Sequence, residues 1–173
     1  MQDQTRIPVI TKVARDDMLE KLGWMQRSFA RMKTDLDSAE DVQDHFLSFL
    51  HASHLLYFYF ARWAKNIQRP ENPSLLIVKY ISGLSATDAG IWNCLHELRT
   101  EDVHTQPIRI SNPERPGALC VDGQEFLVDG YPILIGDYRY VVQHSGSSHD
   151  LLKLCASCLV VKAKFCRDFD EIV

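Results

Sequence analysis

The chain has 173 residues, of which 46% are hydrophobic and 24% are charged, so it has the composition of an ordinary globular protein. A chain of this length buries a substantial core without disulfides or metal ions, which excludes disordered, collagen-like and small disulfide-stapled proteins. The formal net charge of −4 and the pI of about 5.9 exclude the strongly basic field of a general DNA-coating protein.

Thiol content and hydropathy predict a cytoplasmic protein without a membrane span. The five cysteines are an odd number, and Met1 to Arg6 is polar, unlike the start of a secretory signal peptide. Reduced thiols are therefore expected. The longest uncharged run, His45 to Ala61, has 17 residues, three of them histidines, and is shorter than the roughly 20 apolar residues that a bilayer span requires.

Two long helices are predicted at the start of the chain. In Thr11 to Thr34 the apolar residues recur at spacings of three, four and seven, which is typical of an amphipathic helix. Ser38, followed by acidic residues, is a suitable N-cap for a second helix. That helix should end near Arg69, because Pro70 cannot continue it.

The rest of the helical part of the chain contains one short apolar segment and two further predicted helices. Ser74 to Ser82 is apolar, and its type stays open between helix and strand. Ser85 is a suitable N-cap for a third long helix, which Pro107 ends. After a turn rich in serine and glycine at Ser145 to Ser148, the apolar periodicity of His149 to Phe169 predicts a final amphipathic helix.

Between the third long helix and the final helix, the residue composition of Ile108 to Val142 is typical of β-structure. Asp122-Gly123 and Asp129-Gly130 are dipeptides that favour tight hairpins, and Pro132 indicates an edge strand or the start of a strand. The expected strands are Ala118 to Val121, Gln124 to Val128, Tyr131 to Ile135 and a further one at Tyr138 to Val142. The prediction is therefore one mainly α domain over residues 1–173, an antiparallel bundle of four to five helices with a small antiparallel β meander inserted at about 108–142 before the last helix.

Positive charge is concentrated at the two ends of the chain. Residues 1–35 carry seven Lys or Arg against five Asp or Glu, whereas residues 36–106 carry five against nine. Residues 151–173 carry four against three. A polyanion would therefore contact the first and last helices, through Arg27, Arg31, Lys33, Lys162, Lys164 or Arg167; the alternative is that these are ordinary solvated helix faces.

The densest polar cluster of the third long helix is His96 to His104. Glu101 and His104 have the i, i+3 spacing of carboxylate metal sites in helical bundles. Such sites need a second Glu-x-x-His on another helix, and the chain has none. We therefore predict neither a metal ion nor another cofactor.

Arg99 and His104 fit a different chemistry, the cleavage of a phosphodiester. A guanidinium can hold the phosphate, and a histidine can transfer protons near neutral pH. Five positions place the two side chains about 140° apart on a straight helix. They converge only if the helix ends or distorts before Pro107, or if a second copy of the chain supplies one of them.

At these residues the sequence resembles the HEPN superfamily, helical proteins of bacterial toxins and defence nucleases. The family signature is an arginine followed, after four to six residues, by a histidine near a helix end, and Arg99-Thr-Glu-Asp-Val-His104 matches it with four intervening residues. The family often has Asn, Asp or His directly after the arginine, where this chain has Thr100. The resemblance covers the first three long helices and extends to the last one, about two-thirds of the chain, and it leaves the strand-rich segment unexplained.

The resemblance implies metal-independent cleavage of RNA by a toxin or defence protein, with an antitoxin as a potential partner. Arg99 would hold the phosphate, His104 would transfer protons, and His96, Glu101 and Asp102 would support them. The alternative is a noncatalytic interaction or scaffold module of the same fold. In that case Arg99 pairs with Glu101 or Asp102 and His104 caps the helix.

Two further residue pairs and one apolar stretch complete the sequence-based predictions. His51 and His54 have metal-compatible spacing, and Cys155 and Cys158 resemble a metal or redox pair, but core packing is the better interpretation of both. Between Leu55 and Ala64 the second helix is apolar nearly all round, which predicts a homodimer.

Overall fold

The computed structural model describes most of the chain, namely residues 6–66, 72–104, 108–114, 116–121, 124–125, 127–128 and 131–170. This part contains five α-helices: α1 Arg6–Thr34, α2 Ala39–Asn66, α3 Pro73–Ser82, α4 Ala86–His104 and α5 Leu151–Arg167, followed by the 3₁₀ turn η1 Asp168–Asp170. The prediction of a mainly helical chain with a small antiparallel sheet before the last helix is confirmed. No helix in these ranges is long and apolar enough to cross a membrane.

Side-chain caps explain where several helices begin. The Ser38 hydroxyl accepts a hydrogen bond from the amide of Asp41 at 3.3 Å, and the Ser85 hydroxyl accepts one from the amide of Asp88 at 3.1 Å. Both caps are those that the sequence predicted. At α5 the cap is Asp150, so this helix begins slightly later than predicted.

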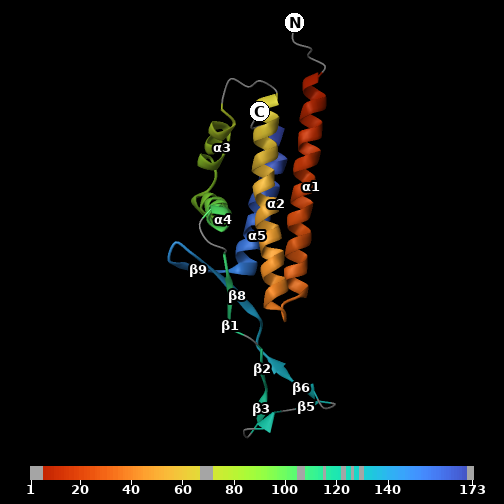
Figure 1. Ribbon diagram of the computed structural model, residues 1–173, viewed down its shortest axis with the longest axis vertical. Coiled ribbons are helices and arrows are strands. Elements are labelled where there is room, and N and C mark those ends of the chain that lie inside the picture. The colour runs from red at the N-terminus through yellow and green to blue at the C-terminus, as the bar shows by residue number, and fades with distance from the viewer. Residues whose placement is uncertain are drawn as a thin grey trace.

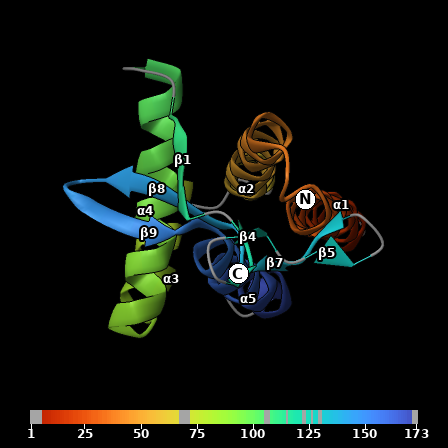
Figure 2. The ribbon, with the colours of Figure 1, turned by 90° about the horizontal axis from the view of Figure 1, so that it is seen from below.

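Three long helices lie side by side, and the other two lie across them. Helices α2 and α5 run in one direction and α1 runs in the opposite direction (Figure 1). Helix α4 is seen almost end-on in that view, so it crosses the other three instead of running antiparallel to them (Figures 1 and 2). The apolar segment at 73–82, whose type the sequence left open, is helix α3.

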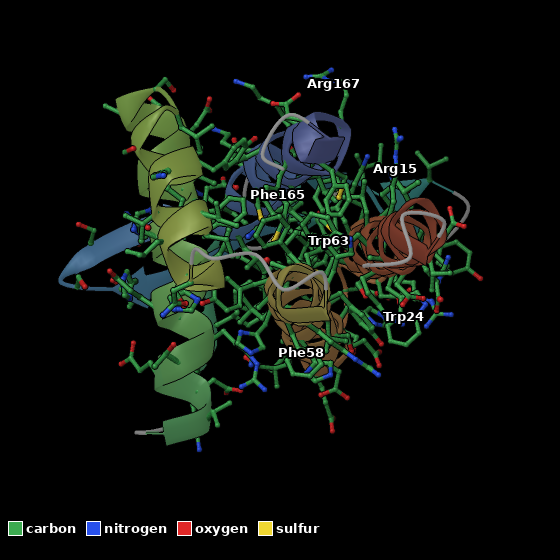
Figure 3. The ribbon with its side chains drawn as sticks, turned by 90° about the horizontal axis from the view of Figure 1, so that it is seen from above. Arg15, Trp24, Phe58, Trp63, Phe165 and Arg167 are labelled. Atoms are coloured by element: carbon green, nitrogen blue, oxygen red, sulfur yellow. The ribbon has the colours of Figure 1, made fainter. Side chains whose placement is uncertain are left out.

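The core between these helices is rich in aromatic rings, and Figure 3 shows Trp63 and Phe165 at its centre. The ring centroids of Trp63 and Phe169 are 4.6 Å apart, and those of Phe60 and Phe165 are 5.3 Å apart. The aromatic cluster comprises Phe60, Trp63, Tyr80, Trp92, Phe165 and Phe169. It joins α2, α3, α4 and α5 into one packed unit.

A three-stranded antiparallel sheet lies at the N-terminal end of α5, and two of its strands were not predicted. Its strands are β1 Ile110–Glu114, β8 Arg139–His144 and β9 Ser147–Asp150, in the order β1-β8-β9. The turn between β8 and β9 places Ser145 and Gly146 at positive φ angles of 48° and 77°. The central strand β8 buries Tyr140, Val141 and Val142.

The remaining strands form an arm that projects from the helices (Figure 1). Its three two-stranded ladders are β2 Gly117–Ala118 with β7 Leu134–Ile135, β3 Cys120–Val121 with β4 Gln124–Glu125, and β5 Leu127–Val128 with β6 Tyr131–Pro132. The arm is inserted between β1 and β8, so the predicted simple meander is replaced by a sheet and an extension of it. No described side chain of the arm is buried.

The side chain of Gln43 connects helix α2 to the start of the sheet. Its amide nitrogen donates a hydrogen bond to the carbonyl of Ile108 at 2.8 Å, and its amide oxygen accepts one from the backbone N–H of Ile110 at 2.8 Å. A single glutamine thus satisfies two backbone groups, as a neighbouring strand would.

We expect Gln43→Ala to lower the free energy of unfolding by about 2 kcal/mol, because it leaves two partly buried backbone groups without partners. Urea unfolding followed by circular dichroism measures this loss. Gln26→Ala, at an exposed position of α1, is the matched control and should change stability by less than about 0.5 kcal/mol. Equal effects of the two substitutions would contradict the proposed link.

Candidate functional site

Arg99 lies on the fourth turn of α4 and has unused hydrogen-bonding capacity. Its side chain is 20% exposed, and Nη1 is 3.7 Å from Oδ2 of Asp102. The Nε and Nη1 atoms are buried and have no hydrogen-bond partner. A buried donor without a partner is costly, so these two nitrogen atoms are suited to a small acceptor such as a water molecule.

The Arg99 side chain borders a small cavity between α2, α4 and α5. The cavity has a volume of about 10 Å³, close to the space needed by one water molecule. Its walls are formed by Ser53, His54 and Tyr57 from α2, by Trp92, Leu95, His96 and Arg99 from α4, and by Lys162 from α5. Four of these side chains can carry positive charge, so the cavity favours a water molecule or an anionic group over a cation.

Two histidines and a tyrosine stack at the outer side of this cavity. The ring centroids of His54 and His96 are 6.3 Å apart, and those of Tyr57 and His96 are 6.0 Å apart. Burial and the positive charge of Arg99 lower the pKa of His54 below its ordinary value of 6.5. His54 is therefore neutral near pH 7 and can accept a proton.

Lys162 forms the inner wall of the cavity and is fully enclosed, with 3% of its surface exposed. Its ammonium lies 3.2 Å from the centroid of the Trp92 ring, a cation–π contact, and forms no ion pair with a described carboxylate. Burial lowers the pKa of Lys162 to about 8. Burial also raises the pKa of the neighbouring Cys158 thiol to about 11, so that group is neutral.

The two predicted acidic supporting residues do not line the cavity, and both contact residues of the sheet or of its start. Oδ1 of Asp102 accepts a hydrogen bond from the backbone N–H of Ile108 at 3.2 Å, while its other oxygen pairs with Arg99. Glu101 lies 3.6 Å from His144 on β8, and that histidine also contacts Glu97 at 2.8 Å. Asp102 therefore orients Arg99, and Glu101 contributes to the attachment of β8 to α4.

The predicted partner of Arg99, His104, is the last residue of α4. Its side chain lies outside the described residues, as does Pro107. The predicted convergence of Arg99 and His104 therefore stays a prediction. His96, predicted as a supporting residue, is exposed on its outer side and lines the cavity next to Arg99.

The sequence-based predictions missed His54 and Lys162 as neighbours of Arg99. The predicted core packing is confirmed for Cys155 and Cys158, which are fully buried, but it is wrong for His51, which is exposed. His54 is half-buried and faces α4. The sequence signals that pointed to these two residues were the histidine pair within an apolar helix and the basic character of the last helix.

No group of three or more His, Cys, Asp or Glu side chains within the described ranges is arranged to hold a metal ion. Comparison of the chain with models of protein families, with curated protein sequences and with solved structures finds no match. The case for a function therefore depends on the geometry around Arg99 and on the sequence motif.

Proposed function

We propose that the protein is a HEPN-like helical bundle of the cytoplasm that cleaves RNA without a metal ion, with Arg99 holding the phosphate that is attacked. The observation that carries this proposal is the position of Arg99, whose side chain is 20% exposed beside the exposed His96 and borders the cavity lined by His54 and Lys162. Preorganised cationic donors of this kind stabilise the charge that develops on a phosphate in the transition state.

The proposed reaction needs one proton acceptor and one proton donor. The acceptor removes the proton from the ribose 2′-hydroxyl, whose oxygen then attacks the adjacent phosphorus. The bond from phosphorus to the 5′-oxygen breaks, and that oxygen takes up a proton from the donor, leaving a 2′,3′-cyclic phosphate and a 5′-hydroxyl. The lowered pKa of His54 supports it as the acceptor, and the sequence motif supports His104 as the other proton-transfer group.

A second candidate, a noncatalytic interaction module, is favoured by the Arg99–Asp102 ion pair. An arginine held by its own helix can have a purely structural role. In this case a second copy of the chain, or another protein such as an antitoxin, would cover the apolar side chains that are more than half exposed on α2 and α3, namely Phe58, Leu75 and Val78. Phe58 lies on the outer side of α2 in Figure 3.

Cleavage of a single-stranded RNA by the purified protein in the presence of a chelator tests the proposal. We expect Arg99→Ala to reduce the rate by about 100-fold or more and Arg99→Lys to recover part of it, because the planar fork of donors is lost while the charge remains. His54→Ala and His104→Ala, examined separately, should each reduce the rate by about 100-fold or more.

Arg62→Ala, which removes the same charge from an exposed position of α2, is the control and should cleave normally. Cleavage that persists in Arg99→Ala, or that the chelator abolishes, contradicts the mechanism. Absence of cleavage by the native protein, together with a dimer in sedimentation, favours the interaction module.

A further inference from the structure

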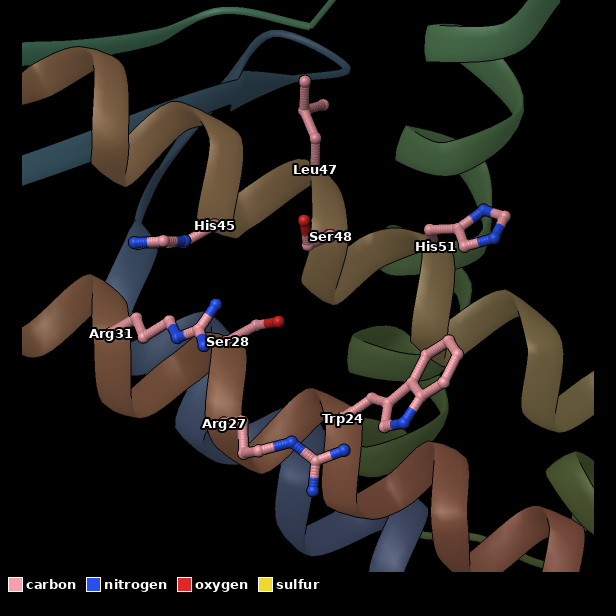
Figure 4. A pocket seen from close by; sticks show the side chains of 8 residues that line it. All are labelled: Trp24, Arg27, Ser28, Arg31, His45, Leu47, Ser48 and His51. Carbon is pink, nitrogen blue, oxygen red and sulfur yellow. The ribbon is translucent and has the colours of Figure 1, made fainter.

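A second and larger hollow lies between α1 and α2, on the side of α1 that faces away from α5 (Figures 3 and 4). This groove has a volume of about 530 Å³, within the range of small-molecule sites. Its walls are formed by Trp24, Arg27, Ser28 and Arg31 from α1 and by His45, Leu47, Ser48 and His51 from α2. None of the residues around Arg99 belongs to it.

The helical period explains why one wall of the groove carries this chemistry. Trp24, Arg27, Ser28 and Arg31 occupy positions i, i+3, i+4 and i+7, which share one face of an α-helix. Ser48 and His51 form a similar stripe on α2. In Figure 4, Arg31 and Ser28 face His45 and Ser48 across the groove, and Trp24 lies farther along α1.

The groove is strongly cationic, and its arginines are not neutralised within the described part of the chain. No carboxylate forms its walls. Neither Arg27 nor Arg31 forms an ion pair or side-chain hydrogen bond with another residue there. His45 is held by Asp35, which lies outside the groove, with 2.8 Å between Nε2 and Oδ2.

An aromatic ring lies beside these charges. Trp24 is 39% exposed, whereas Trp63 and Trp92 are buried in the core. The ammonium of Lys21 lies over the Trp24 ring at 3.5 Å from its centroid, which fixes the position of the indole on α1. A fixed, partly exposed indole is a suitable surface for the stacking of a planar base.

We propose that this groove binds a free nucleotide, with its phosphate on Arg27 and Arg31 and its base against Trp24. Two guanidinium groups one helical turn apart can form paired hydrogen bonds with phosphate oxygens, and the hydroxyls of Ser28 and Ser48 can complete the set of donors. The site is separate from the cavity at Arg99 and goes beyond the proposed cleavage of RNA.

The distribution of the basic residues favours a small ligand over a long nucleic acid. The other basic helix is α5, and Figure 3 places its Arg167 on the opposite side of the molecule from Trp24. The groove and Arg167 of α5 therefore face different sides of the molecule. A long strand would need a continuous basic track along its backbone.

Titration of the full-length protein with adenosine 5′-monophosphate, adenosine and inorganic phosphate tests this site, with calorimetry and tryptophan fluorescence as readouts. We expect the monophosphate to bind at least about tenfold more tightly than adenosine or phosphate alone, and to change the fluorescence of Trp24. Arg27→Ala and Arg31→Ala should each weaken its binding by about tenfold or more. Trp24→Leu should remove the advantage of the monophosphate over inorganic phosphate.

Two matched variants make the outcomes distinguishable. Arg62→Ala removes a positive charge from α2 outside the groove and should leave binding unchanged. Arg99→Ala should also leave it unchanged, so the proposed function and this site can fail separately. Absence of binding, or binding that Arg27→Ala and Arg31→Ala do not weaken, overturns the proposal. Tighter binding of a short oligoadenylate by the same residues would also overturn it, in favour of an RNA track.

Discussion

Phe165→Ala is expected to lower the free energy of unfolding by about 4 kcal/mol, a large part of the total stability of a domain of this size. The Phe165 side chain is fully buried, and its ring centroid lies 5.1 Å from those of Tyr80 and Trp92 and 5.3 Å from that of Phe60. The substitution therefore leaves a cavity where α2, α3, α4 and α5 meet. Urea unfolding at neutral pH, followed by circular dichroism, measures the loss.

Phe58→Ala provides the matched control for this substitution. Phe58 is 51% exposed on α2, and its removal should cost less than about 1 kcal/mol in a monomer. Phe165→Leu should recover about half of the loss, because it refills most of the cavity. A cost below about 1 kcal/mol for Phe165→Ala would show that the aromatic cluster is not the centre of the core.

Lys162→Met is expected to stabilise the protein by about 2 kcal/mol at pH 7. The lowered pKa of Lys162, about 8 against an ordinary 10.5, corresponds to a cost of about 3 kcal/mol for burying the charged ammonium. The cation–π contact with Trp92 favours the charged ammonium, so its loss reduces the gain from replacing the lysine. Thermal or urea unfolding of the two proteins at pH 7 measures the difference.

The gain from Lys162→Met should shrink as the pH rises from 8 towards 10.5. In this range the folded protein has released the proton of Lys162 and the unfolded chain still holds it, so the native protein becomes relatively more stable. Burial raises the pKa values of the Cys158 and Cys166 thiols, which destabilises the fold at high pH in both proteins. Because the charge of Lys162 lowers these two pKa values, its removal weakens the variant further at high pH and acts in the same direction. Lys164→Met, at an exposed position of α5, should show neither effect. A gain that does not depend on pH would contradict the assigned charge.

The helices were predictable because their signals are local. Ser38 and Ser85 cap the helices for which they were predicted, and the apolar periodicity of 11–34 identified α1. The strands β1 and β9 were missed because their local signals indicate other structure. Strand β9 overlaps Ser145 to Ser148, whose serine and glycine content predicted a turn. Strand β1 contains Pro113, and its pairing with β8 is irregular between Ser111 and Glu114.

The candidate site was only partly predictable because its members come from three helices. Arg99 was identified from its motif, but Lys162 and His54 lie 63 and 45 residues away along the chain. Only the crossing of α4 over α2 and α5 brings them together. The groove at Trp24 was only partly predictable for the same reason. The sequence indicated the basic residues of α1, but the groove forms only where α2 packs beside them.

The arm has a consequence for how this protein can diverge over evolutionary time. The chain enters the arm at Gly117 and Ala118 and leaves it at Leu134 and Ile135, and these residues pair with one another. Entry and exit are thus adjacent, and the arm contributes no described side chain to the core. Insertions and deletions beyond this first ladder can therefore change the length and surface of the arm without moving β8 or the helices. The arm is the part of the molecule on which new recognition properties can accumulate at the lowest cost to folding.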